Sequence, residues 1–118
     1  KKERTILEKT LSSNSNIVVA IGGGTPCYGD TMGFIKSSEN TISIYLKSSH
    51  KELTDRLFNK RLNRPLIAHI PSPELLNDFI RKHLFERSYF YNQCEIKLST
   101  DNLTIAAAIE EIIKKISN

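Results

Sequence analysis

The sequence predicts an α/β domain in which helices cover both faces of a parallel sheet. Predicted strands alternate with predicted helices along the chain, a pattern that implies right-handed crossovers between parallel strands. The run Ile17–Ile21 is continuously apolar and rich in β-branched residues, as is typical of a strand buried on both faces. A length of 118 residues corresponds to about one domain and suffices for a hydrophobic core.

Composition narrows the classes of protein further. Hydrophobic residues make up 39% and charged residues 25%, which is close to the globular average. The longest apolar run, Ile17–Ile21, is far shorter than the ~20 residues of a membrane-spanning helix. Cys27 and Cys94 form no C-x-x-C pair, so we expect two free thiols in a reducing cytoplasm. A net charge of +4 is compatible with nucleic acid, phosphorylated small molecules or no particular partner.

The first third of the chain is expected to contain two helices and one strand. Residues 2–11 have apolar positions at helical spacing, and a polar loop follows at 12–16. The strand 17–21 ends in three glycines, and a short helix is expected from about 30 to 36. Its apolar side chains, which we expect to be buried, are Met32, Phe34 and Ile35.

The middle of the chain begins with a second strand at 41–46. Ser49 and Glu52 have the spacing of a capping box, which predicts that a helix begins there. The apolar face of this helix consists of Leu53, Leu57 and Phe58. Residues 61–72 contain two prolines and no sustained period, so we expect a loop.

The last third is predicted to be a long helix, a short strand and a final helix. Ser72-Pro73 is an N-cap followed by proline at the first helical position, and the helix should extend to about Tyr91. The apolar positions of this helix are Leu75, Leu76, Phe79, Ile80, His83 and Leu84. A strand at 96–98 precedes a helix over 106–116. The side chains expected to face inward there are Ile105, Ala108, Ile109, Ile112, Ile113 and Ile116.

Candidate binding residues lie where parallel strands end, because ligands bind at the carboxyl ends of such strands. The triplet Gly22–Gly24 directly follows a predicted strand. It is either a flexible turn or a site where a ligand lies against exposed backbone amides, which suit a carboxylate, a hydroxyl or a phosphate. The triplet matches neither G-x-G-x-x-G nor G-x-x-x-x-G-K-[ST].

Two arginines are further candidates. Pro65 pushes Arg64 toward an extended conformation, and a loop of this length suits a lid over a polyphosphate, although a solvated arginine is the alternative. Arg87 and Tyr91 are four residues apart on one helix face. Arg87 is either a surface arginine or a group that grips a carboxylate with two hydrogen bonds.

In this order, the features resemble the shikimate kinase family, whose members phosphorylate the 3-hydroxyl of shikimate with ATP in the route to chorismate and the aromatic amino acids. The resemblance covers essentially all 118 residues. The matching pieces are Val19–Gly24, Ile44–Leu46, Leu53-x-x-Arg56-Leu57, Arg64-Pro65-Leu66-Ile67 and Arg87-x-x-x-Tyr91. It implies a P-loop kinase fold of three layers, α/β/α, without the first strands of that fold.

The resemblance also implies a role for each candidate residue. Shikimate would contact the triplet and Arg87, with Gly23 and Arg87 meeting its carboxylate. Arg64 would lie on a lid, touch the ATP phosphates and stabilise the transition state. The adenine would stack on Arg56 and border the segment that contains Asn102 and Thr104. The residues assigned to shikimate are therefore Gly22, Gly23, Gly24 and Arg87, and those assigned to ATP are Arg56, Arg64, Asn102 and Thr104.

Two departures from the family pattern affect these expectations. The family usually has threonine where this chain has Ile21, and the P-loop, the catalytic aspartate and a first carboxylate-binding arginine are not found in residues 1–118. We therefore expect a single domain, 1–118, that is the C-terminal two-thirds of a kinase, with its lid at about 61–72. It should supply the substrate cradle but no metal ligand or catalytic base, and be inactive alone. The parent enzyme would be a cytoplasmic monomer acting on shikimate and MgATP.

Two alternatives remain open at this point. One is a related small-molecule kinase acting on gluconate or a nucleotide, although such enzymes are not expected to combine the glycine triplet with R-x-x-x-Y. The other is a basic, non-catalytic binding protein, for example one that binds nucleic acid. Few aromatic residues and no helix-turn-helix pattern disfavour this second alternative.

Overall fold

The computed structural model describes residues 2–13 and 16–117. The helices predicted at 2–11 and from Pro73 to Tyr91 have those bounds. The helix predicted at about 30–36 lies at 31–37, and the helix predicted at 106–116 extends one residue further at each end, which is within the usual variation of helix ends. Residues 14 and 15 of the predicted loop at 12–16 lie outside the described residues. The elements are α1 (Lys2–Leu11), the 3₁₀ helix η1 (Thr25–Cys27), α2 (Thr31–Ser37), β1 (Ile44–Lys47), α3 (His50–Phe58), the 3₁₀ helix η2 (Arg61–Asn63), α4 (Pro73–Tyr91), β2 (Ile96–Ser99) and α5 (Ile105–Ser117).

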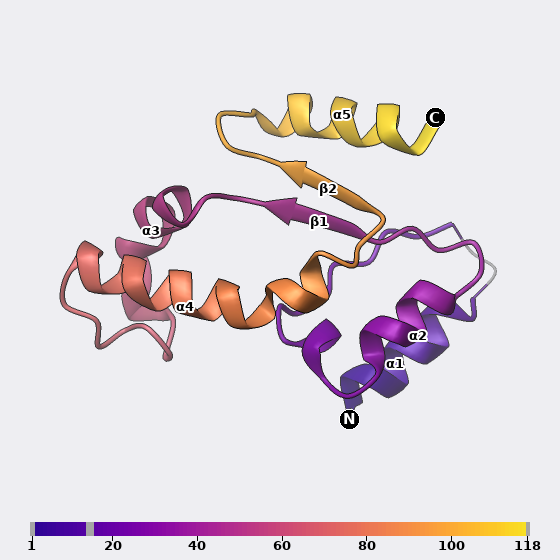
Figure 1. Ribbon diagram of the computed structural model, residues 1–118, viewed down its shortest axis with the longest axis horizontal. Coiled ribbons are helices and arrows are strands. Elements are labelled where there is room, and N and C mark those ends of the chain that lie inside the picture. The colour runs from indigo at the N-terminus through magenta and orange to yellow at the C-terminus, as the bar shows by residue number, and fades with distance from the viewer. Residues whose placement is uncertain (1, 14–15, 118) are drawn as a thin grey trace.

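The sheet confirms the predicted parallel arrangement. β1 pairs with β2 in parallel, with Ile44 opposite Ile96 and Lys47 opposite Ser99. Helix α5 lies on one side of these strands and α4 on the other, so the layers run helix, sheet, helix (Figure 1). The predicted α/β class is therefore confirmed, with a sheet of two strands in the described part of the chain.

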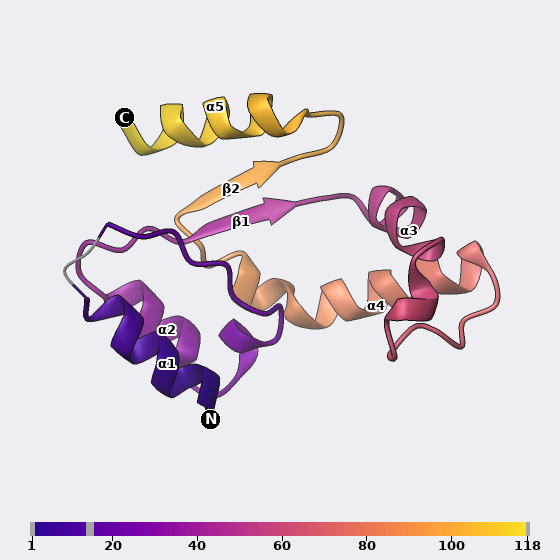
Figure 2. The same ribbon diagram turned by 180° about the vertical axis from the view of Figure 1, so that it is seen from behind.

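The predicted strand at 17–21 is wrong as a strand. Residues 17–21 are extended and follow the same direction as β1, yet they join no ladder (Figures 1 and 2). Val18 is fully exposed and Ile17 is half exposed. The physical reason is that a strand needs hydrogen-bonding partners for its backbone, and none of the described residues supplies a strand beside this segment.

The predicted helix caps are confirmed at Ser49 and Ser72. The Ser49 hydroxyl accepts from the Glu52 amide at 3.1 Å, and the Ser72 hydroxyl accepts from the Leu75 amide at 3.2 Å. The capping box is only half formed, however, because the Ser49 amide donates to the Asp101 carboxylate at 3.0 Å instead of to Glu52. This contact ties the start of α3 to the turn after β2.

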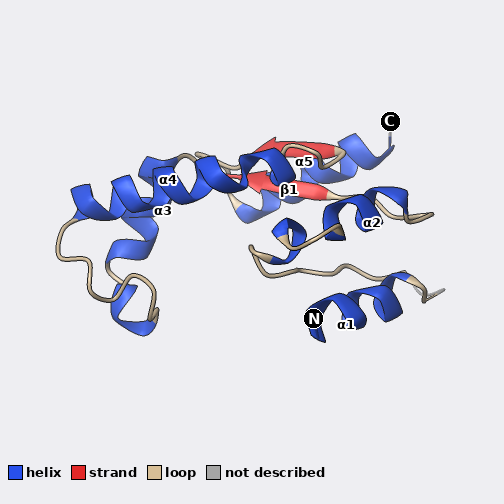
Figure 3. Cartoon of the chain, turned by 60° about the horizontal axis from the view of Figure 1, so that its bottom comes forward, coloured by secondary structure: helices blue, strands red, loops and turns tan. Residues whose placement is uncertain are grey.

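Two clusters of buried side chains form instead of one core. The first joins α3, the segment 61–72 and α4, and its buried members are Ile67, Ile70, Leu76 and Ile80. The second joins α1 and α2, and its buried members are Leu7, Met32 and Ile35. Figure 3 shows these two parts at opposite ends of the molecule, with α4 extending between them. The radius of gyration, 15.8 Å, exceeds the about 13.5 Å of a compact domain of this length, as this division would produce.

The inward face predicted for the last helix is only partly correct. Ala108 and Ile112 are half-buried, but four isoleucines on α5 stay between 47% and 83% exposed. A two-stranded sheet is too narrow to cover the whole apolar face of a helix. These isoleucines are Ile105, Ile109, Ile113 and Ile116. Among the described residues, no helix is both long and apolar enough to cross a membrane.

Candidate functional site

The glycine triplet forms a turn that leads from the extended segment into η1. The Gly22 carbonyl accepts from the Thr25 amide and the Gly24 carbonyl from the Cys27 amide, each at 3.0 Å. All three glycines are exposed, and within the described part of the chain none of their amides donates a hydrogen bond. The turn therefore has unused N–H donors, which the second of the two alternatives for the triplet, a ligand site, requires.

Arg87 lies directly against this turn. A Cβ atom added to Gly23 would stand 2.8 Å from Arg87 Nη1, and one added to Gly24 would stand 3.5 Å from Arg87 Nη2. The expectation that Arg87 points toward the triplet from the end of α4 is thus confirmed. Among the described residues, no acidic side chain forms an ion pair with this arginine. Its charge remains available for an anion beside the glycine amides.

The positive charge of Arg87 affects the ionisation of Cys27, which lies in the same turn. Burial raises the pKa of the Cys27 thiol, and the positive charge of Arg87 opposes part of this increase. Cys27 Sγ also lies 3.9 Å from the Gly23 carbonyl oxygen, within the same turn. The field of Arg87 therefore acts on a thiol three residues beyond the triplet.

Tyr91 completes the contact between α4 and the turn. Its hydroxyl donates to the Gly23 carbonyl at 2.5 Å and accepts from Arg87 Nη1 at 3.3 Å. The sequence analysis noted Tyr91 only as part of a motif and gave it no role. Its position four residues after Arg87 was the available signal.

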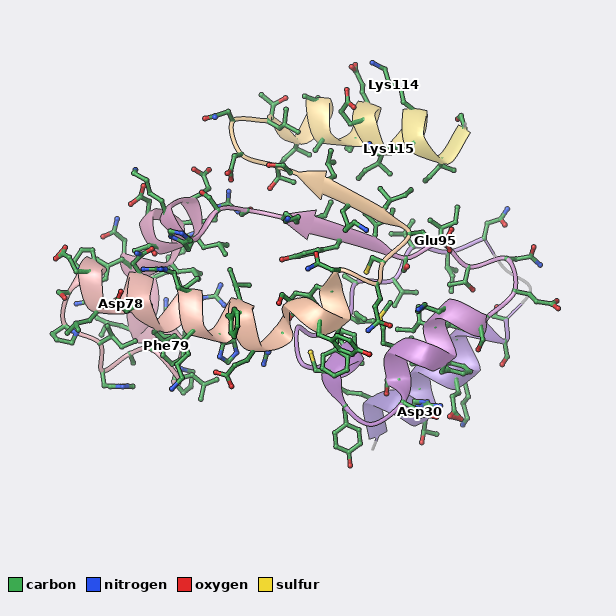
Figure 4. The ribbon with its side chains drawn as sticks, in the orientation of Figure 1. Asp30, Asp78, Phe79, Glu95, Lys114 and Lys115 are labelled. Atoms are coloured by element: carbon green, nitrogen blue, oxygen red, sulfur yellow. The ribbon has the colours of Figure 1, made fainter. Side chains whose placement is uncertain are left out.

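Helix α1 supports the turn from the opposite side, which the sequence did not reveal. The buried Thr25 hydroxyl donates to Glu3 at 2.5 Å. Arg4 pairs with Asp30 at 2.6 Å and lies 4.7 Å from the centre of the Phe34 ring. The hydrogen bond and charge of Arg4 hold the pKa of Asp30 below its usual value. Figure 4 shows Asp30 at the start of α2, next to α1.

The residues assigned to ATP lie on other elements than the glycine turn: α3, the segment after η2 and the connection between β2 and α5. Arg56 on α3 pairs with Glu52 at 3.3 Å and is exposed. Arg64 is exposed and extended, with φ −128° and ψ 103°, as its place before proline predicts. Asn102 has a left-handed φ of 64° in the turn after β2. Thr104 caps α5, because its hydroxyl accepts from the Ala107 amide at 3.0 Å.

An open cavity of about 640 Å³ lies between the end of β1, the start of α3 and α4. Lys47, Arg81 and Lys82 bring positive charge to its lining, and Asp78 brings one carboxylate. Lys47 ends β1, where binding residues often lie, but Asp78, Arg81 and Lys82 lie within α4, and no sequence signal marked them as a site.

The described residues contain no cluster of side chains of the kind that usually binds a metal ion. Across residues 2–13 and 16–117, no three His, Cys, Asp or Glu side chains are close enough together to hold a metal ion. The side chains at the glycine turn therefore do not fit Mg²⁺, and we assign no chemical step to it.

Comparisons with known proteins place the chain in a family. A family model described as shikimate kinase matches residues 1–117. The chain belongs to the shikimate kinase family. The shikimate kinase of Flavobacterium johnsoniae is 37% identical over 113 residues, and that of Flavobacterium psychrophilum is 36% identical over 114 residues. These matches cover 96% and 97% of this chain, but the chain spans only 64% and 65% of the two relatives.

A solved structure of the shikimate kinase family has the same fold. The crystal structure of shikimate kinase from Bacteroides thetaiotaomicron matches with a TM-score of 0.74 and 26% sequence identity. The match covers 96% of this chain and 60% of that one. Most of this chain is therefore accounted for within the shikimate kinase fold, whereas a large part of the relative has no counterpart in residues 1–118.

Proposed function

We propose that residues 1–118 form the substrate cradle and lid of a shikimate kinase, an enzyme that transfers the γ-phosphoryl group of ATP to the 3-hydroxyl of shikimate. The observation that carries the proposal is the position of Arg87 against Gly23 and Gly24, beside three unused amides. A guanidinium and amides directed at one place suit a carboxylate, which shikimate has. Family membership supplies the rest of the argument.

Within this proposal, ATP binds toward the other end of α4. Arg64 would close over the phosphates, Arg56 would stack on the adenine, and Asn102 and Thr104 would border it. Mg²⁺ would be held by groups outside the glycine turn, because the side chains there do not fit it. The enzyme would act as a cytoplasmic monomer on small molecules alone.

The test uses what we call the complete enzyme: residues 1–118 preceded in one polypeptide by the P-loop portion of the family, grafted from the Flavobacterium johnsoniae relative where needed. We expect ATP-dependent formation of shikimate 3-phosphate, with shikimate preferred when gluconate competes. A preference for gluconate, or no phosphorylation of shikimate by a folded protein, would contradict the proposal.

The lid role of Arg64 leads to a separate prediction. The segment 61–72 is anchored by the buried side chains of Ile67 and Ile70, whereas the Arg64 side chain is exposed. In the complete enzyme, Arg64→Ala should lower the turnover number at least about fivefold, roughly 1 kcal/mol, because an arginine on the transferring phosphate acts in the transition state. The Michaelis constant for shikimate should change little.

Steady-state kinetics with ATP and shikimate varied in turn would measure this effect. Asn63→Ala is the matched control, since Asn63 is an exposed neighbour in η2 with no proposed role. A turnover number that falls less than fivefold in Arg64→Ala would show that Arg64 is a surface residue.

A further inference from the structure

Tyr91 contacts two of the proposed substrate groups at once. We infer that Tyr91 is a positioning residue, which fixes the Gly23 carbonyl and the Arg87 guanidinium relative to each other so that amides and guanidinium face one anion. The contacts are the 2.5 Å hydrogen bond to the Gly23 oxygen and the 3.3 Å hydrogen bond from Arg87 Nη1. The inference rests on the proposed function, in which the anion is the shikimate carboxylate.

The glycine turn requires a tether of this kind. Glycine has more backbone freedom than any other residue, and the extended segment before the triplet has no ladder to hold it within the described part of the chain. The Tyr91 hydroxyl reaches the turn from α4, 68 positions away in sequence. A single hydrogen bond to the Gly23 carbonyl therefore limits the orientation of the amides on either side of it.

The chemistry of a hydroxyl suits the second contact. Arg87 has five N–H donors, and a carboxylate partner would hold it firmly but would compete with an incoming anion. The Tyr91 hydroxyl is a neutral acceptor, so it orients Nη1 without neutralising the charge. This agrees with the absence of any ion pair to Arg87 among the described residues.

The tyrosine ring is held independently of its hydroxyl. Its centre lies 5.0 Å from that of Tyr45 on β1, with the two ring planes tilted by 50°. Tyr45 is half-buried, which raises its pKa, and this ring contact is therefore partly shielded from water. Tyr91→Phe therefore removes the two hydrogen bonds and keeps the ring contact.

The first experiment is a double-mutant cycle in the complete enzyme. Tyr91→Phe should raise the Michaelis constant for shikimate by ~5- to 20-fold, with that for ATP within about twofold of wild type. Tyr89→Phe is the matched control, because Tyr89 is 73% exposed on the same helix. Adding Tyr91→Phe to Arg87→Ala should raise the shikimate constant by a smaller factor than Tyr91→Phe does alone, because only the tether on the glycine amides is then left to lose. Fully additive effects, or a constant within twofold of wild type in Tyr91→Phe, would overturn the inference.

The second experiment tests the hydrogen bond from Tyr91 to the Gly23 carbonyl without measuring catalysis. Cys27 lies in the same turn, so its alkylation by iodoacetamide, followed by mass spectrometry, should be at least about threefold faster in Tyr91→Phe than in Tyr89→Phe. Equal rates would overturn the tether whether or not the enzyme phosphorylates shikimate. If Cys27 is alkylated faster in Tyr91→Phe than in Tyr89→Phe but the wild type fails to phosphorylate shikimate, the proposed function fails and the tether stands. Faster alkylation with an unchanged shikimate constant would overturn the positioning role.

Discussion

Arg87→Ala in the complete enzyme is expected to raise the Michaelis constant for shikimate by at least ~30-fold, with the constant for ATP nearly unchanged. The guanidinium lies against Gly23 and Gly24 and has no acidic partner among the described residues. Its removal would leave the glycine amides as the proposed carboxylate contacts within residues 1–118. Losing one partner of a desolvated charge pair typically costs ~2–5 kcal/mol.

Two further variants make this result specific. Arg87→Lys should recover only part of the affinity, because lysine cannot form two parallel hydrogen bonds with a carboxylate. Glu86→Gln, at an exposed position next to Arg87 on the same helix, should leave the shikimate constant within about twofold of wild type. A shikimate constant within threefold of wild type in Arg87→Ala would show that the carboxylate binds elsewhere.

Gly23→Ala should weaken shikimate binding without unfolding the protein. The new Cβ atom would lie 2.8 Å from Arg87 Nη1, which is too close, and 3.1 Å from the Tyr91 hydroxyl, which is a tight contact. The end of an arginine side chain can move at little energetic cost, so the guanidinium would leave its place. We expect the shikimate constant to rise at least ~10-fold and the melting temperature to change by less than about 4 °C.

The chain offers graded controls for this substitution. A Cβ atom on Gly24 would stand 3.5 Å from Arg87 Nη2, an ordinary contact, so Gly24→Ala should have a smaller effect than Gly23→Ala. Gly33→Ala adds a Cβ atom with nothing within 4 Å inside α2, and alanine is the better helix former by about 1 kcal/mol. It should keep wild-type kinetics. Equal shikimate constants in the Gly23 and Gly33 variants would contradict the proposed cradle.

Local signals in the sequence predicted the helices well. Ser49 and Ser72 specify where α3 and α4 begin, because each side chain accepts a hydrogen bond from an amide three residues later. Predicting these helix starts therefore requires no knowledge of distant contacts. The segment 17–21 failed as a strand for the opposite reason. Its β-branched residues favour extension, and it is extended, but a strand also requires a neighbouring backbone that its own residues cannot provide.

The sequence was sufficient to predict the main binding groups of the candidate site, but not the hydrogen bonds that hold them in place. The glycine triplet and Arg87 stood out because of their residue types and spacing, and the structure brings them together. The hydrogen bonds from Tyr91 to Gly23 and from Thr25 to Glu3 join residues far apart in sequence. Neither periodicity nor capping rules contain information about such pairs. The hydrogen bond from the Ser49 amide to the Asp101 carboxylate could not be predicted for the same reason.

The division of the buried side chains into two clusters has a consequence for how the chain reaches its folded state. The cluster of Ile67, Ile70, Leu76 and Ile80 draws only on residues close together in sequence, so its formation closes short loops. The cluster around Leu7 needs Phe90 and Cys94 from near the other end of the chain. Chains with local contacts fold faster than those that must first bring distant segments together. The base of the lid would therefore form early, and the glycine turn would be among the last parts to take shape.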